Sequence, residues 1–403
     1  MPNFHIFPDG ILLLVSLASL AAITAALRRT GRFRESKAWR VRLAAASLMV
    51  SALYLAGYLS ISARVARHFP AGVVPWMQAS ALILSMVSVG TCVAMGAVEL
   101  LKRTRLGEAA DPERRALFRV ACGAVLASPV AATSFGILRC NDIGLKETPI
   151  EIPGLPADLH GLRIAQLTDI HLSAFLSESD LERAVDMING LRAQITLVTG
   201  DLITRTGDPL DACLKQIRRL RADAAVLGCL GNHEIYTRTE NYVTAECARM
   251  GIDILRTQKR LLRFGAAKVN VGGVDYQKMH EPYLTGAGAL TEPGALNILL
   301  SHNPDVFPVA VSQGWDLTIA GHTHGGQVNV EILDSNINLA RFFTPYTRGL
   351  YWMEGSAAFV SAGIGTVGMP VRLGAPPEVN LLTLRASGAP KPIASARAEQ
   401  CAS

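Results

Sequence analysis

Long uncharged apolar runs dominate the first third of the chain, and shorter alternating segments replace them afterwards. Four runs stand out, over residues 11–27, 43–63, 71–98 and 120–138. A helix needs about 20 apolar residues to cross the roughly 30 Å hydrocarbon core of a bilayer. The first run is at the lower limit of this length, and Pro129 and two glycines weaken the fourth. The pattern predicts a bundle of about four transmembrane helices; buried helices of a soluble domain are the alternative.

The basic residues between these runs predict an orientation. The loop between the first two runs holds seven Arg and Lys residues, and the loop between the last two holds six. The middle loop holds only Arg64 and Arg67. Because loops rich in Arg and Lys remain on the cytoplasmic side, we expect the N-terminus and everything after the fourth run to lie outside the cytoplasm. This predicts a multi-pass protein of the cell (cytoplasmic or inner) membrane with an extracytoplasmic C-terminal domain.

An arginine pair precedes the fourth run. The segment 114–119, RRALFR, resembles a twin-arginine export signal, although it lies inside the chain. Residues 130–132, Val-Ala-Ala, are small enough for a cleavage site, but we expect this run to be retained as an anchor.

A different periodicity begins after a linker rich in Pro and Gly at residues 149–156. Strand-like segments alternate with segments of helical spacing, which is typical of βαβ units and a largely parallel sheet. The predicted strands are 162–168, 195–199, 225–230, 269–274, 296–300, 317–320, 357–361 and 379–384, and the predicted helices are 181–191, 210–220 and 242–250. We expect an anchor region at 1–146, a catalytic domain at 147–388 and a disordered tail at 389–403, with a second sheet among the later, closely spaced strands.

The composition of the chain argues against two classes of function, nucleic-acid binding and metal binding by cysteine thiolates. The 403 residues are 50% hydrophobic and 18% charged, and the net charge is +6. The basic residues cluster in loops between apolar runs, and no nucleic-acid-binding motif is present, so we expect no nucleic-acid partner. The seven cysteines form no CxxC pair, which argues against a thiolate metal site, and Cys213, Cys229 and Cys247 are expected in the core.

Polar side chains, among them residue types that can bind metals, follow five of the predicted strands at the point where each strand ends. They are Asp169 and His171, then Asp201, then Asn232 with His233 and Glu234, then His302 with Asn303, and finally His322 and His324, with glycines at 200, 231 and 321. In open α/β sheets, ligands bind beyond the carboxyl ends of the strands. Asp-x-His and His-x-His would place both side chains on one side of an extended segment.

Each of these pieces alone indicates little. A single Asp-x-His is usually a loop, and Asn-His-Glu alone is typical of a helix cap. Together they supply carboxylate oxygens and imidazole nitrogens, which suit Zn, Mn or Fe, and one carboxylate can bridge two such ions. The sequence therefore predicts a site for two divalent metal ions.

In its motifs and their order, the segment 160–385 resembles the calcineurin-like metallophosphoesterase superfamily, and residues 372–378, RLGAPPE, resemble its membrane-associated bacterial branch. The resemblance implies a four-layer α/β/β/α sandwich. Every position at which the family has a metal ligand carries a suitable residue in this sequence. The resemblance also implies that Asp169, His171 and His324 hold one metal ion, that Asn232, His302 and His322 hold the other, and that Asp201 bridges them. His233 would assist the leaving group.

The implied reaction is hydrolysis of a phosphomonoester or phosphodiester by a hydroxide that bridges the two ions. His233 would donate a proton to the leaving oxygen or only stabilise its charge. A lipid head group, a cell-envelope phosphate and a soluble nucleotide all remain open as substrates, and the oligomeric state is not predicted. The alternative functions are a non-catalytic metal-binding or signalling module and a transporter, although the apolar runs hold almost no ionisable residue that a transport pathway would need.

Further polar residues have weaker interpretations. Asp275 would orient a ligand histidine or cap a loop, and Asp305 has no assigned role. Tyr346, Arg348 and Tyr351 would face a substrate or, as we expect, pack within the fold.

Overall fold

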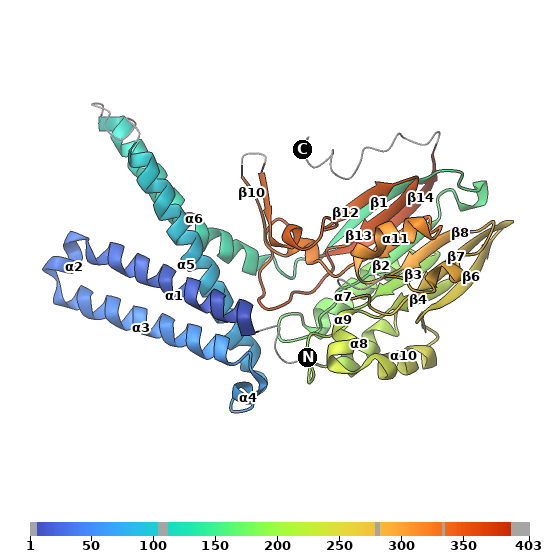
Figure 1. Ribbon diagram of the computed structural model, residues 1–403, viewed down its shortest axis with the longest axis horizontal. Helices are drawn as coiled ribbons and strands as arrows, with labels where there is room; N and C mark the ends of the chain where they lie inside the picture. The colour runs from blue at the N-terminus through green and yellow to red at the C-terminus, as the bar shows by residue number, and fades with distance from the viewer. Residues whose placement is uncertain (1–5, 104–111, 279–282, 333–334, 388–403) are drawn as a thin grey trace. The chain divides into compact units, whose positions relative to one another are not determined.

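The computed structural model describes residues 6–103, 112–278, 283–332 and 335–387 (Figure 1). The expected tail at 389–403 lies outside these residues. The chain divides into two compact units, one formed by residues 1–138 with 368–371 and one formed by the remainder from residue 139 onward. Each unit is described separately.

The first unit is helical. Its helices within the described residues are α1 (Ile6–Arg28), α2 (Gly31–Glu35), α3 (Lys37–Leu59), α4 (Ala63–Ala66), α5 (Val74–Lys102) and α6 (Pro112–Leu138). Four of them, α1, α3, α5 and α6, are long and apolar enough to cross a membrane. The helix pattern therefore agrees with the four predicted spans, with shifted ends: the second run was expected to continue to residue 63, whereas α3 ends at Leu59.

Small and hydroxylated residues form the contact between α3 and α5. Gly57 lies so close to Ala81 and Met77 that a Cβ atom there would clash with both. Tyr54 and Ser88 share a buried hydrogen bond of 2.6 Å. Such close backbone approach and interhelical hydrogen bonding are typical of helices that associate in membranes.

The fourth run forms a continuous helix despite its proline. Pro129 lies inside α6 and has no N–H for the carbonyl of Val125, four residues before it, and this carbonyl instead accepts a hydrogen bond of 2.9 Å from the Ser128 hydroxyl. Proline in a spanning helix is tolerated where such side-chain bonds satisfy the freed backbone groups.

The second unit contains two six-stranded sheets and a hairpin. The first sheet has the order β1-β14-β2-β3-β4-β5, and the second has the order β12-β13-β9-β8-β7-β6. The strands of the first sheet are β1 (Gly144–Ile152), β2 (Arg163–Leu167), β3 (Ile195–Thr199), β4 (Ala225–Cys229), β5 (Asp253–Ile254) and β14 (Glu378–Ala386). Those of the second are β6 (Gln258–Phe264), β7 (Ala267–Gly273), β8 (Leu296–Leu300), β9 (Leu317–Ala320), β12 (Gly349–Met353) and β13 (Ser356–Val360), and the hairpin is β10 (Asn329–Ile332) with β11 (Ser335–Asn338).

Helices cover the outer faces of both sheets. They are α7 (Glu178–Gly190), α8 (Leu210–Ile217), α9 (Asn232–Thr237), α10 (Glu240–Arg249) and α11 (Phe307–Ser312). Alternate residues of each strand point to opposite faces, so Ile164 lies between the sheets while Ala165 packs in the cluster that includes α7 and α8. Phe307 of α11 packs with Ala358 and Val360 of the second sheet. The result is the four-layer α/β/β/α sandwich that the resemblance implies.

The linker expected at residues 149–156 is partly wrong, because residues 144–152 form strand β1. The strand pairs only with β14, at the edge of the sheet. Edge strands tolerate proline, since their outward N–H groups need no partner in the ladder. Pro149 therefore indicated a linker where the chain forms an edge strand.

The arrangement of parallel strands positions the candidate site. Strands β2, β3 and β4 run parallel in the first sheet, and β7, β8 and β9 run parallel in the second. The carboxyl ends of each parallel group meet at one edge, and the loops that follow β2, β3, β4, β8 and β9 carry the predicted ligand residues.

Candidate metal centre

Seven predicted ligand side chains come together between the loops of the two sheets. Six of them are buried, with exposed fractions of 8% or less, and His322 is partly buried. Hydrogen bonds tie the loops together: the His322 N–H donates to Asp169 Oδ1 at 2.9 Å, and the His233 N–H donates to Asp201 Oδ1 at 2.9 Å. The first of these bonds joins the β9 loop of one sheet to the β2 loop of the other.

The side chains fall into three groups whose ligand atoms lie within 4.8 Å of one another. The groups are Asp169 with His171 and His324; His171 with Asp201 and His233; and Asp201 with His302 and His322. The first and third are the two sets that the resemblance implies, without Asn232. His233 lies near ligand atoms as well, so its position is compatible with binding a metal as well as with assisting a leaving group.

Several donor atoms in this cluster have no hydrogen-bond partner among the described residues. His171 Nε2, His302 Nε2, His324 Nδ1 and Asn232 Oδ1 are all buried and unpaired. His302 Nε2 lies 3.0 Å from Asp201 Oδ2, yet it does not form a hydrogen bond of good geometry. Buried polar atoms normally find partners, and the uncompensated ones are explained if a cation attracts their lone pairs. The donor set therefore fits divalent metal ions.

Backbone carbonyls orient two of the rings. His302 Nδ1 lies 2.6 Å from the Thr199 carbonyl, and His233 Nδ1 lies 2.6 Å from the Thr204 carbonyl. Because a carbonyl oxygen can only accept, Nδ1 carries the proton in both rings. The opposite nitrogen, Nε2, is then free to ligate a metal or to exchange a proton, which is how outer partners usually fix ligand histidines.

The expectation of extended Asp-x-His and His-x-His segments is wrong. Asp169, His171, Asp201, His322 and His324 all adopt positive φ, between 47° and 74°. This region is uncommon for residues other than glycine, and such strain persists where the surrounding structure enforces it. The ligand loops turn in the left-handed conformation, and this turning aims the side chains inward.

Glycines give the loops room to meet. Gly200 has φ of +87°, and a Cβ atom there would lie 2.5 Å from Gly231 N and 2.8 Å from His302 Nδ1. Gly321 packs against Thr168 and the Asp169 carboxylate. These contacts confirm the interpretation that glycines beside the ligands allow close approach of the backbone.

The buried charges strongly perturb one another. Burial raises the pKa of Asp169 to about 6, despite the opposing effect of His302. Burial also acts to raise the pKa of Asp201, but His302 beside it holds this pKa well below its usual range. Burial opposes a charge on His302, yet Asp201 and Asp169 raise its pKa to about 10. A proton on His302 thus balances the two carboxylates, and a bound cation would take over that balancing charge.

Burial keeps His171, His322 and His324 in the neutral form. Burial lowers the pKa of His171 and of His322 to about 3, and lowers that of His324 well below its usual value. Imidazoles bind metals in the neutral form, so these three rings need no deprotonation before they ligate.

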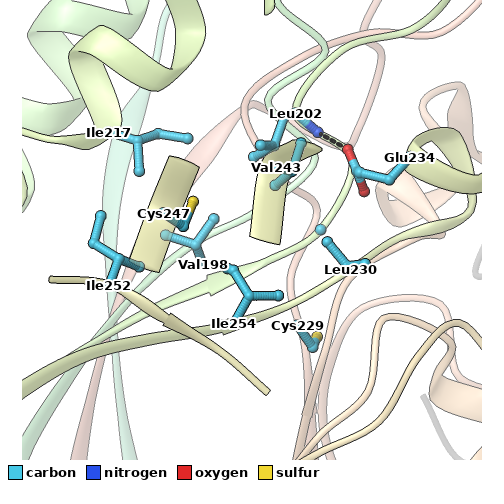
Figure 2. Close-up of a pocket in the computed structure, with 11 residues that line it drawn as sticks. Val198, Leu202, Ile217, Cys229, Leu230, Glu234, Val243, Cys247, Ile252 and Ile254 are labelled. Atoms are coloured by element: carbon cyan, nitrogen blue, oxygen red, sulfur yellow. Dashed lines mark hydrogen bonds between the residues drawn. The ribbon is translucent and has the colours of Figure 1, made fainter. Parts of the chain in front are cut away.

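Glu234, to which the sequence alone assigns no role, supports the backbone beside Asp201. Its buried carboxylate accepts from the N–H groups of Asp201 at 3.0 Å, Leu202 at 2.8 Å and Gly231 at 2.7 Å. Figure 2 shows this carboxylate at the edge of a small pocket whose other side chains are apolar, including Val243 and Cys247. This pocket belongs to the packing behind the site, and the three predicted core cysteines, Cys213 among them, are buried.

Arg372 forms a clamp behind the first ligand group. Its buried guanidinium donates to the carbonyls of Ala375 and Ala362, both at 2.9 Å, and to those of Gly363 and Gly365. Gly365 in turn donates its N–H to the Asp169 carbonyl at 2.8 Å. Burial lowers the pKa of Arg372 to about 10, against the attraction of Asp169 and Glu378. The RLGAPPE segment therefore shapes the loop against which Asp169 and His171 lie.

Two tyrosines border the histidines. The ring of Tyr276 lies 5.5 Å from His322 and 6.2 Å from His302, and that of Tyr236 lies 5.6 Å from His233. Burial raises the pKa of Tyr276, so its phenol stays neutral. Asp275 does not orient a ligand histidine. Its two carboxylate oxygens accept hydrogen bonds from Arg256, at 2.8 Å from Nε and at 3.0 Å from Nη2.

The cluster of Tyr346, Arg348 and Tyr351 packs within the fold, as expected. Tyr346 is buried against Phe307 and the ring of Tyr351. Arg348 forms an ion pair with Glu378.

Comparisons with known proteins agree with this site. Residues 162–326 match the family model described as calcineurin-like phosphoesterase. The chain is 29% identical over 259 residues to a transmembrane protein with a metallophosphoesterase domain from Bos taurus, covering 60% of this chain and 57% of that protein. It is 26% identical over 285 residues to the uncharacterized metallophosphoesterase YkuE of Bacillus subtilis, covering 68% of this chain and 98% of that protein.

The similarity to solved structures is low. A purple acid phosphatase from yellow lupin is 14% identical, with a TM-score of 0.32 over 53% of this chain and 45% of that one. A likeness at this level says nothing about function. The class defined by the family model and the relatives is that of metal-dependent phosphoesterases. The domain over residues 162–326 is thus similar to calcineurin-like phosphoesterases, and the similar proteins include a bacterial metallophosphoesterase and a transmembrane protein with a metallophosphoesterase domain.

The Arg372 clamp generates a prediction. Arg372→Lys keeps the charge but not the planar fork, and buried carbonyls left unpaired cost about 1–3 kcal/mol each. We expect a lower unfolding temperature in detergent and weaker metal binding, measured by thermal unfolding with and without added Mn²⁺. Arg385→Lys, at an exposed position of β14, is the control and should match the parent protein. Equal metal affinity in both variants would contradict the clamp.

Proposed function

We propose that this protein is a membrane-anchored phosphoesterase that binds two divalent ions, Mn, Zn or Fe, and hydrolyses a phosphomonoester or phosphodiester. One observation carries the proposal: buried carboxylate and imidazole groups from both sheets converge with unpaired donor atoms. If these residues only stabilised the fold, their buried polar atoms would be expected to have hydrogen-bond partners. In this proposal Asp201 bridges the ions, since its Oδ2 atom lies 3.5 Å from His171 Nε2 of one ligand set and 3.0 Å from His302 Nε2 of the other.

The other ligands divide between the two ions. Asp169, His171 and His324 would hold one ion, and His302 and His322 would hold the other. Asn232 would complete the second set through its buried, unpaired Oδ1 atom. When bound, such ions polarise phosphoryl oxygens and lower the pKa of water.

The chain's own residues would orient the substrate and move a proton. His233 keeps its Nδ1 proton on the Thr204 carbonyl, so its Nε2 atom is the one that can deliver a proton to a leaving oxygen. Such general-acid assistance typically contributes about 10²–10⁴-fold to the rate. Tyr276 and Tyr236, beside the histidines, would border a bound ester and exclude water from one side.

The four apolar helices favour an amphipathic substrate at the membrane surface, such as a lipid or cell-envelope phosphate. The proposal places the phosphoesterase domain outside the cytoplasm of a cell membrane, because the basic loops favour that orientation.

A hydrolysis screen tests the proposal. The detergent-purified chain would be assayed with Mn²⁺, Zn²⁺ or Fe²⁺ against bis-p-nitrophenyl phosphate, p-nitrophenyl phosphate and phospholipids. We expect metal-dependent release of product from at least one substrate. Tight binding of metal without turnover of any ester would favour a non-catalytic metal-binding module instead.

The bridging role predicts the effect of Asp201→Ala. Loss of a carboxylate that lies beside both ligand sets should remove most of both ions, as measured by elemental analysis of the purified protein. Asp211→Ala, at an exposed position of α8, serves as the control. Retention of two ions in the Asp201 variant would eliminate the bridging role.

His233→Ala distinguishes a proton donor from a metal ligand. If His233 assists the leaving group, this variant keeps its metal and loses roughly 10²-fold or more of its turnover. Elemental analysis and initial rates would be compared with His160→Ala, a histidine exposed outside the cluster. A loss of bound metal in the His233 variant would identify it as a ligand, as its group with His171 and Asp201 also allows.

A further inference from the structure

Two adjacent phenylalanines project from the phosphoesterase unit. Phe342 is 80% exposed and Phe343 is 73% exposed, the largest fractions among the exposed large hydrophobic residues described from residue 139 onward. Arg341 and Pro345, on either side of the pair, are exposed as well. Single exposed apolar residues are ordinary on protein surfaces, but two neighbouring aromatic rings exposed to this extent indicate a contact.

The projecting pair, residues 342–343, is held by an anchor on each side. On one side the buried Asn338 accepts from the Ala340 N–H at 2.9 Å, and its amide donates to the Gly325 carbonyl at 3.1 Å. On the other side Thr344 donates to Asp305 at 2.5 Å and accepts from the Tyr346 N–H at 3.0 Å. The phenylalanines therefore extend from a fixed turn.

Both anchors form hydrogen bonds to loops that carry candidate ligands. Gly325 directly follows His324, and Asp305 lies three residues after His302. Two short hydrogen-bonded paths therefore connect the phenylalanine pair to the candidate metal centre. A surface bound by the pair would set the orientation of that centre relative to the surface.

We propose that Phe342 and Phe343 insert into the interfacial region of the lipid bilayer that holds the apolar helices. Helix α6 is long and apolar enough to cross a membrane and ends at Leu138, while β1 begins at Gly144. At about 3.3–3.6 Å per residue, the residues between them span at most roughly 20 Å. A domain on so short a tether remains beside the bilayer surface, within reach of its head groups.

The chemistry of the segment suits this occupant. Aromatic side chains bind at the boundary between head groups and acyl chains, and a neighbouring basic residue adds attraction to lipid phosphates. Arg341 supplies that charge beside the rings. If the proposed function holds, this contact directs the centre toward phosphate esters embedded in the same bilayer, and soluble esters gain nothing from it.

A fluorescence experiment locates the pair without any assay of activity. The full chain with Phe342→Cys or Phe343→Cys would be labelled with an environment-sensitive dye and reconstituted into vesicles of phosphatidylglycerol and phosphatidylcholine. Unsubstituted protein treated identically corrects for native cysteines. We expect blue-shifted emission that is quenched by nitroxide-bearing lipids. Leu261→Cys is the control, because Leu261 is also an exposed apolar residue but lies on β6, at the other end of the second sheet from β12. A dye at this position should remain unquenched.

Other occupants would give different results. A second copy of the chain would produce a shift that grows with protein density in the vesicles and is insensitive to nitroxide lipids. Docking on the chain's own helices would give a blue shift that depends neither on protein density nor on nitroxide lipids. Either result, or water-like emission at both sites, overturns the proposal.

A second arm measures the functional consequence. The double variant Phe342→Ser with Phe343→Ser should fold and bind metal like the parent, because both side chains are exposed. We expect kcat/KM to fall about ten-fold or more for a phosphate ester within vesicles and to stay unchanged for bis-p-nitrophenyl phosphate. Equal loss on both substrates, or no loss on either, contradicts the proposal. If the parent hydrolyses neither ester, the proposed function fails, and the fluorescence arm alone decides the membrane contact.

Discussion

The mutual burial of Asp169, Asp201 and His302 is the constraint on which this fold depends. Carboxylates removed from water need a compensating charge, which a protonated His302 between them supplies together with the buried Arg372 guanidinium near Asp169. The arrangement is held from behind by Glu234, which accepts three backbone N–H groups, and by the Arg372 clamp. Much of the loop structure around the site can be understood as the means of keeping these charges close together.

This constraint explains why both sheets are needed. Asp169 and Asp201 follow strands of the first sheet, whereas His302 follows a strand of the second. The apolar layer between the sheets, built from alternate residues such as Ile164 and Ile298, fixes how far apart those loops lie. Core packing and charge compensation therefore meet at the same edge of the sandwich, and a change in one is transmitted to the other.

Much of this could be predicted from the sequence. Short, mostly apolar segments located β3, β8 and β9 at their observed bounds, because these strands are buried on both faces. Edge elements were missed: β1 carries Pro149, and β6 is polar on its exposed face. The ligand residues were recognisable from their order, but their left-handed backbone was not, since tertiary contacts impose positive φ on side chains that disfavour it. The role of Arg372 escaped prediction because its partners are carbonyl groups, which no side-chain pattern reveals.

The position of the last strand has a consequence for how the protein is made. Strand β14 lies between β1 and β2, so the first sheet cannot close until residues 378–386 have left the ribosome. More than two hundred residues separate the apolar helices from β14 along the chain. The helices can therefore enter the bilayer before the strands of the first sheet are complete. If the domain lies outside the cytoplasm, as proposed, this order of synthesis is compatible with passage of an unfolded domain across the membrane, followed by closure of the sheet and metal loading. Export of an already folded domain would instead require the helices to wait for the end of the chain.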